Sequence, residues 1–142
     1  MTFDPHQFFA EENSPPAPLH LGWRLIDFDF DKGWIKTGFD PKPEFLNPSG
    51  NIQGGFISAM LDDTLGPSIL IKTRGKLIGP TIDLHTHFLS PLKLGPVTAE
   101  GRVTKMGQRI AFTEGQLFDA DGKLCARATS SNMLLPLQMK NK

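Results

Sequence analysis

Cysteine, tyrosine and long apolar stretches are scarce or missing in this 142-residue chain. Its one cysteine, Cys125, excludes an internal disulfide and a four-cysteine zinc site. No stretch approaches the roughly 20 apolar residues of a membrane-spanning helix. Residues 1–13 lack the basic segment and following apolar run of a secretory signal. We therefore expect a soluble, cytoplasmic protein that has no membrane partner.

An excess of charge of either sign is also missing, because 15 Lys and Arg residues balance 15 Asp and Glu residues. Proteins that bind nucleic acid through its phosphates carry a basic excess, so nucleic acid is not an expected partner. The 39% of hydrophobic residues is enough for the core of one domain. The 14 glycines and 12 prolines indicate many tight turns and therefore much β-structure.

Hydrophobic alternation predicts the order of the secondary-structure elements. Residues 23–39 alternate with period two on both sides of a turn and predict a β-hairpin. Residues 53–70 predict one long helix. Four further strands are expected at 81–89, 97–105, 109–118 and 123–135, the first with Ile82, Leu84 and Phe88 on one face. The order β-β-α-β-β-β-β indicates an α+β fold, with a curved antiparallel sheet of about six strands around the helix.

Two short regions flank this predicted domain of residues 23–136. Residues 1–22 form an appendage, in which a short helix near Phe8 and Phe9 is followed by an extended link through Pro15, Pro16 and Pro18. Residues 137–142 form a polar tail.

The long helix is apolar around most of its circumference, which is typical of a buried helix. Either the sheet curls around it or a second subunit covers it. Asp62 and Asp63 lie in its middle, and a buried carboxylate needs a partner, a route to water or a catalytic role. Gly66 and Pro67 are expected to kink or shorten the last turn.

Two glycines, Gly54 and Gly55, occupy the first turn of this helix although glycine is a poor helix former. The N–H groups of a first turn are free donors at the positive end of the helix dipole, so they could bind the oxygen of a polarised carbonyl. The alternative is tight packing of the helix start against a strand.

The pattern Asn47, Gly50, Gln53-Gly54-Gly55 and Asp62 resembles the signature of hotdog-fold acyl-CoA thioesterases of the phenylacetate-pathway (PaaI-like) type. In that family a His-Gly-Gly segment is followed by an Asp nine positions after the His, which selects Asp62 over Asp63. Gln53 replaces the usual His; it can form hydrogen bonds but cannot gain a charge. The run from Thr81 to Gly95 also resembles the family's next strand and loop.

This resemblance implies a thioesterase that acts on an acyl-CoA or acyl-carrier-protein thioester, with no metal or cofactor. It implies that the Gly54 N–H binds the carbonyl and that Asp62 activates water or attacks directly. Asn47, Gln53 and Thr81 would complete the catalytic site. Gly55 and the turn residues Lys105, Gly107 and Arg109 would bind the substrate, although the two cations could equally be ordinary surface charge, as could Arg102 beside them.

The helix geometry adds an independent expectation about assembly. Gly54 and Asp62 are eight residues apart, which on a helix is a rise of about 12 Å, too far for both to act on one carbonyl. The two groups at one site would therefore come from different subunits. This agrees with the homodimer or homotetramer that the resemblance implies.

Three other sets of residues could indicate other chemistry. Asp27, Asp29, Asp31 and Gly33 resemble the start of a calcium loop, but Lys32 occupies the required glycine position and Gly38 the required glutamate position. Asp83, His85 and His87 share one face of a strand and could form a metal cluster. The interpretation that this is simply the outward face of the sheet is favoured. Cys125 has no basic partner nearby in sequence, which favours a buried thiol over a nucleophile.

Two functions other than thioester hydrolysis can be compared with these residues. A hydratase or dehydratase of the same fold pairs a His with a carboxylate, but the helix and its leading loop contain no His. A non-catalytic module that binds acyl-CoA remains open, because Gln53 replaces the usual His. The chain has 11 phenylalanines and no tyrosine, so an apolar pocket would suit aromatic and straight-chain acyl groups alike.

Overall fold

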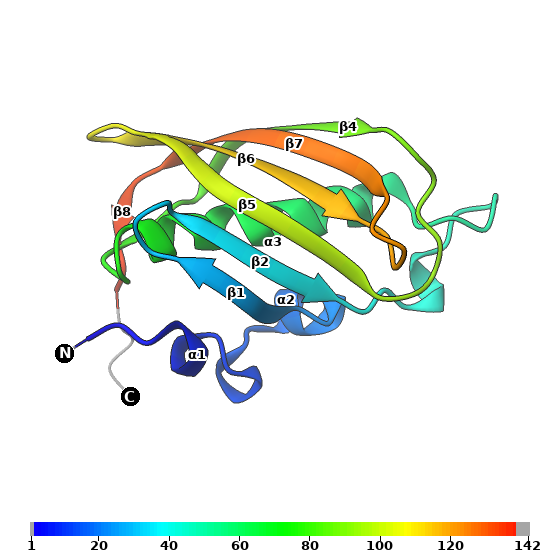
Figure 1. Cartoon of the computed structure of the whole chain (residues 1–142), viewed down its shortest axis with the longest axis horizontal. Helices are drawn as coiled ribbons and strands as arrows, with labels where there is room; N and C mark the ends of the chain where they lie inside the picture. Colours follow the sequence, from blue (N-terminus) through cyan, green and yellow to red (C-terminus); the bar gives the residue numbers. More distant parts are fainter. Residues whose placement is uncertain (1, 139–142) are drawn as a thin grey trace.

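The computed structural model, which describes residues 2–138, has one long helix packed on one face of an antiparallel sheet. In the view of Figure 1 the helix α3 lies behind the sheet. Most of the predicted tail, residues 139–142, lies outside the described residues. The helices are α1 (Pro5–Phe8), η1 (Glu11–Asn13), α2 (Pro16–Leu21), η2 (Pro43–Phe45) and α3 (Gly54–Lys72). The strands are β1 (Arg24–Asp29), β2 (Trp34–Phe39), β3 (Leu77–Ile78), β4 (Thr81–Phe88), β5 (Val97–Met106), β6 (Ile110–Phe118), β7 (Leu124–Met133) and β8 (Leu135–Pro136).

The sheet has six strands in the order β1-β2-β5-β6-β7-β4, and every neighbouring pair is antiparallel. This confirms the predicted α+β architecture and the hairpin expected over residues 23–39. The short strands β3 and β8 form a separate pair that the alternation pattern did not predict. Because β1 and β4 are the two edge strands, each has one side that pairs with no strand among the described residues.

Helix α3 continues through Pro67 to Lys72, so of the two expected effects, a kink or a shortened last turn, the shortening is wrong. Pro67 has no N–H and cannot bond to the carbonyl of Asp63, four residues earlier. The indole N–H of Trp23 donates to that carbonyl instead, at 2.7 Å. The side chain of the residue just before β1 thus satisfies the backbone group that the proline leaves free.

The core lies between α3 and the sheet strands β2, β5 and β6. Gly101 and Gly115 pair across β5 and β6, and a Cβ on either would lie within 3.1 Å of the Leu65 side chain. These two glycines let the helix approach the sheet closely. The buried residues of α3 are Ile57, Met60, Leu61, Thr64, Leu65, Ser68, Ile69, Leu70 and Ile71.

The opposite face of α3, which carries Asp62 and Asp63, is only partly buried in the single chain. The sheet therefore does not enclose the helix completely. No helix in residues 2–138 combines the length and the apolar character needed to cross a membrane.

The N-terminal segment is more helical than expected. Residues Pro16–Leu21 form the helix α2, where an extended link was predicted. Pro16 occupies the first helical turn, in which a missing N–H costs nothing, and Gly22 ends the helix in the left-handed conformation. Leu21 is part of the buried core, and the rings of Phe9 and Trp23 lie 4.9 Å apart. The segment thus packs on the domain.

Candidate active site

The loop before α3 is held in shape by Asn47. Its side-chain oxygen accepts hydrogen bonds from the backbone N–H groups of Ser49, at 3.0 Å, and Asn51, at 3.1 Å. Its backbone N–H donates to the Asn51 carbonyl at 2.7 Å. These three hydrogen bonds of Asn47 hold the shape of the loop that precedes the helix. The sequence pattern did not indicate them.

Gln53 lies at the N-cap position of α3, with an extended backbone and an exposed side chain. Its N–H donates to the Phe45 carbonyl at 2.8 Å, and its own carbonyl accepts from Phe56 and Ile57. The rings of Phe45 and Phe56 stack with centroids 4.0 Å apart. These contacts fix the direction in which the helix begins, while the Gln53 side chain stays exposed beside it.

The two glycines of the first turn have different surroundings. A Cβ on Gly54 would meet the ring of Phe88 at 3.2 Å, whereas a Cβ on Gly55 would meet nothing within 4 Å. Gly54 thus packs against strand β4, as the packing alternative expected, and Gly55 faces open space. Within residues 2–138 neither N–H donates to a backbone carbonyl. Both are therefore available to an acceptor outside the chain.

Asp62 and Thr81 are brought together from α3 and β4. The Thr81 hydroxyl donates to the Asp62 carboxylate at 2.6 Å. A second contact ties the same elements, since the Ser58 hydroxyl donates to Thr86 at 3.0 Å. A hydroxyl donor both orients a carboxylate and stabilises its charge. The pair is thus suited to holding the Asp62 carboxylate in one position.

A β-bulge decides where Thr81 points. Thr81 pairs with Asn132 and Asp83 pairs with Ser131, so Ile82 is an extra residue on β4. The expectation that Ile82 shares one face with Leu84 is corrected here: Ile82 is 54% exposed, and Thr81 takes the helix-facing position. An inserted residue reverses the alternation of side chains, and no alternation pattern reveals it.

Asp63, beside Asp62, lies in a different environment. Burial, and to a lesser extent the neighbouring Asp62 charge, raise its pKa from 3.8 to about 6. No hydrogen bond to its carboxylate is found within residues 2–138. A desolvated carboxylate without a donor favours its neutral form. The two adjacent carboxylates therefore differ in character: Asp62 has a hydroxyl donor and Asp63 does not.

This difference predicts how stability changes with pH. Because the pKa of Asp63 is higher in the folded protein, the folded state holds an extra proton between about pH 4 and pH 6, and stability falls as pH rises through that window. We expect Asp63→Asn to raise Tm by roughly 2–4 °C at pH 7.5, equivalent to about 1 kcal/mol after allowance for partial exposure. The gain should shrink towards pH 4.5. Thermal unfolding of both proteins at the two pH values tests this, and a gain that does not change with pH would contradict it.

The predicted substrate-binding cations lie in the hairpin between β5 and β6. Lys105, Gly107 and Arg109 are all exposed there, and the turn is closed by a bond from the Gly107 N–H to the Ile110 carbonyl at 2.9 Å. Figure 1 shows this hairpin at the end of the sheet remote from the loop that leads into α3. One chain therefore does not bring these cations to its own Gly54.

The remaining candidate residues take structural positions. His85 and His87 are exposed, and residues 2–138 contain no group of three or more His, Cys, Asp or Glu side chains arranged to hold a metal ion. Cys125 is buried and free, and burial raises the pKa of its thiol. The carboxylates of Asp27 and Asp29 accept hydrogen bonds from the nearby backbone N–H groups of Phe28 and Lys32.

Sequence reasoning missed several residues that build this site. Phe88 packs on Gly54, Trp23 bonds to the Asp63 carbonyl, and Asn132 is the β7 partner of Thr81. Their contacts join residues far apart in the chain, so no local pattern indicated them. The one available signal was Asn132, a large amide at an inward position of β7, where the other inward positions Ala126, Ala128 and Ser130 carry small residues.

Comparison with known proteins shows the family. The model of the thioesterase superfamily matches residues 49–126, more than half of the chain. This chain belongs to the thioesterase superfamily. The matched residues include every predicted site residue except Asn47.

Individual relatives of the chain support the same family assignment. A protein of Saccharolobus solfataricus that is provisionally named an esterase is 32% identical over 114 residues, covering 80% of this chain and 81% of the relative. Human acyl-coenzyme A thioesterase 13 is 31% identical over 93 residues, covering 64% of this chain and 66% of that protein. A solved structure from Ralstonia eutropha, provisionally described as a thioesterase related to phenylacetic acid degradation, has a TM-score of 0.81 at 27% identity and covers 92% of this chain and 99% of that one. The PaaI-like hotdog fold implied by the Asn47–Asp62 pattern is confirmed.

Proposed function

We propose that this chain is a thioester hydrolase that cleaves an acyl-CoA or acyl-carrier-protein thioester to a free acid and a thiol. The observation that carries the proposal is the hydrogen bond from Thr81 to Asp62. It holds the carboxylate in a fixed orientation, and the chain belongs to the thioesterase superfamily. The human relative is named an acyl-coenzyme A thioesterase, which supports CoA as the carrier.

In the proposed reaction the thioester carbonyl accepts a hydrogen bond from the Gly54 N–H. The positive end of the α3 dipole adds to the stabilisation of the negative oxygen that develops. Asp62 then takes a proton from water as the water oxygen bonds to the carbonyl carbon; the C–S bond breaks and the thiolate recovers the proton. Alternatively Asp62 attacks the carbon itself and expels the thiolate as the C–S bond breaks, forming a mixed anhydride; water then cleaves the anhydride to the free acid and the Asp62 carboxylate, and its released proton goes to the thiolate. Both routes need a carboxylate held in one position, which the hydrogen bond from the Thr81 hydroxyl provides.

The site is proposed to lie between two copies of the chain. The rise of about 12 Å between Gly54 and Asp62 along α3 keeps them from one carbonyl. Strand β4 offers a surface for the second copy, because its outer edge is unpaired within residues 2–138 and the nearby Phe88 and Leu89 are 55% and 48% exposed. A two-fold dimer would then contain two sites, each with one chain's helix start and the other's carboxylate.

The same arrangement assigns the remaining residues. Gln53 and Asn47 form the polar wall beside the helix start, and the open space at Gly55 admits the substrate next to the backbone. Lys105 and Arg109, on either side of the turn at Gly107, supply positive charge for the phosphates of CoA. Since the hairpin is remote from Gly54 of its own chain, its cations would serve a site that includes another chain.

A turnover assay over aromatic and aliphatic acyl-CoA thioesters tests the proposal. We expect hydrolysis of at least one of them, seen as release of the CoA thiol, and no dependence on added metal. Calorimetry on the same thioesters should be run in parallel. Binding of several thioesters without hydrolysis of any would contradict the proposal and would support a non-catalytic binding module.

A further inference from the structure

The bulge in β4 is the feature that points Thr81 towards Asp62. Leu84 packs against the core and Thr86 contacts Ser58 of α3, so strict alternation would turn Ile82 towards the helix and Thr81 away from it. The extra residue reverses this order. Bulges are often found beside active sites, where they redirect a side chain.

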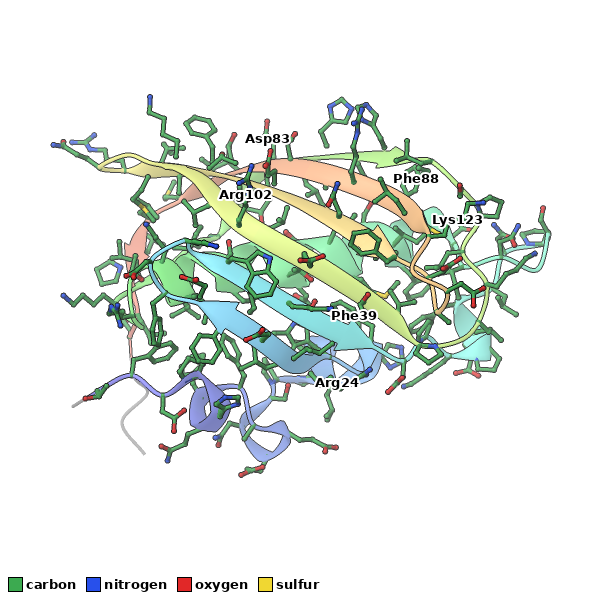
Figure 2. The ribbon with its side chains drawn as sticks, in the orientation of Figure 1. Arg24, Phe39, Asp83, Phe88, Arg102 and Lys123 are labelled. Carbon is green, nitrogen blue, oxygen red and sulfur yellow. The ribbon has the colours of Figure 1, made fainter. Side chains whose placement is uncertain are left out.

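Three contacts from β7 hold the bulge on both sides. Before it, the buried Asn132 side chain donates to the Gly79 carbonyl at 2.8 Å, and the Met133 N–H donates to the Pro80 carbonyl at 2.8 Å. After it, the Ser131 N–H donates to the side-chain carboxylate of Asp83 at 3.1 Å. Asp83 is exposed and is labelled in Figure 2, where it lies at the edge of the sheet beside β7.

Asn132 is itself held by neighbouring hydroxyls. Its side-chain oxygen accepts from Thr113 at 3.1 Å and from Ser130 at 3.0 Å, which leaves the amide nitrogen aimed at Gly79. Asn132 is fully buried. A buried amide whose oxygen and nitrogen both have hydrogen-bond partners is held more firmly than an exposed side chain in a loop.

We infer that Asp83 and Asn132 are positioning residues that hold the β4 bulge, and through it hold the Thr81 hydroxyl against Asp62. This inference rests on the proposed function, in which Asp62 is the reacting carboxylate. It also gives Asp83 a role that its place beside His85 and His87 did not suggest: its side chain binds a backbone amide of the neighbouring strand. Neither residue contacts the substrate; both act through Thr81.

Asp83 offers the sharper test, because an exposed side chain can be removed without opening a cavity. We expect Asp83→Ala to lower kcat about 5- to 10-fold, the effect of weakening one hydrogen bond to the reacting carboxylate, with KM changed less than about twofold. Asp83→Asn keeps an oxygen that can accept from Ser131 and should restore kcat to within about twofold of the wild type. His85→Ala, on the same face of β4 and outside the bulge, is the matched control and should leave kcat unchanged.

A double-mutant cycle separates positioning from general damage. In a Thr81→Val background, Asp83→Ala should cause no further loss of kcat, because the hydroxyl through which it acts is gone. Asn132→Ala should behave in the same way if it folds, as judged by circular dichroism. An equal loss of kcat in both backgrounds, or full kcat in Asp83→Ala, would overturn the inference.

A measurement that does not depend on enzyme turnover separates the test of the positioning role from the test of the proposed function. Amide hydrogen exchange at Ser131 should accelerate in Asp83→Ala and not in His85→Ala or Asp83→Asn. If no thioester is hydrolysed by the wild type, the proposed function fails, and if Asp62→Asn retains full kcat, the role of Asp62 fails, whatever the exchange data show. If Asp62→Asn is inactive while Asp83→Ala keeps wild-type kcat or wild-type exchange at Ser131, the proposed function stands and the positioning role is overturned.

Discussion

Replacement of Asp62 by asparagine is expected to lower kcat at least about 100-fold while the protein stays folded. Asparagine has nearly the same shape and can still accept a hydrogen bond from Thr81, so the contact at 2.6 Å can persist. What is lost is the negative charge that takes a proton from water or attacks the thioester carbon. Steady-state kinetics on the best acyl-CoA thioester, with circular dichroism as a check of folding, measures the effect.

The neighbouring carboxylate provides the matched control for this experiment. Asp63→Asn makes the same chemical change one residue away, in a group that has no hydroxyl donor within the described part of the chain and whose pKa is raised to about 6 by burial. We expect it to lower kcat far less than Asp62→Asn does. An inactive Asp63→Asn together with an active Asp62→Asn would show that the motif spacing selected the wrong carboxylate.

Mixing two inactive variants is expected to restore about a quarter of wild-type activity. Asp62→Ala removes the carboxylate and Gly54→Pro removes the N–H donor, so each variant alone forms a dimer with two defective sites. In a mixed dimer one site receives both defects and the other receives neither. With random pairing half of the dimers are mixed, and each has one intact site of two, which yields the quarter.

The structure shows that Gly54→Pro is a suitable variant. Gly54 is the first helical residue, where proline is well tolerated, and Gln53 before it has the extended backbone that a following proline requires. The added Cβ would meet the far end of the Phe88 ring at 3.2 Å, so the ring needs to shift by only a few tenths of an ångström. The helix start should therefore survive the loss of its N–H.

The mixing experiment needs chain exchange, by co-expression or by joint unfolding and refolding. Light scattering must show dimers or larger assemblies, and tagged chains must co-purify. If both variants fold and exchange chains yet the mixture stays inactive, the site is not shared between chains. Activity of either variant alone would instead remove that residue from the proposed mechanism.

The arrangement of the backbone was largely predictable because it depends on local patterns. Period-two alternation located the strands of the main sheet, and the apolar stretch after Gln53 located α3 to within two residues at its C-terminal end. The N-terminal helix α2 was missed because three prolines indicated an extended link, although Pro16 sits where a helix accepts proline. The sequence pattern did not reveal how α3 compensates for Pro67, because the compensating donor is Trp23, 40 residues before Asp63.

The amino-acid sequence by itself determined the fold class, the family and the candidate carboxylate, because alternation, apolar periodicity and the spacing from Gln53 to Asp62 are properties of neighbouring residues. Only the tertiary structure decided which way Thr81 points, what packs on Gly54 and how Asp62 differs from Asp63. The bulge at Ile82 reverses a strand face without changing the composition of the strand. The raised pKa of Asp63 reflects desolvation by residues distant in sequence. Orientation and burial depend on contacts between segments that are far apart in the chain, and these form only when the chain is folded.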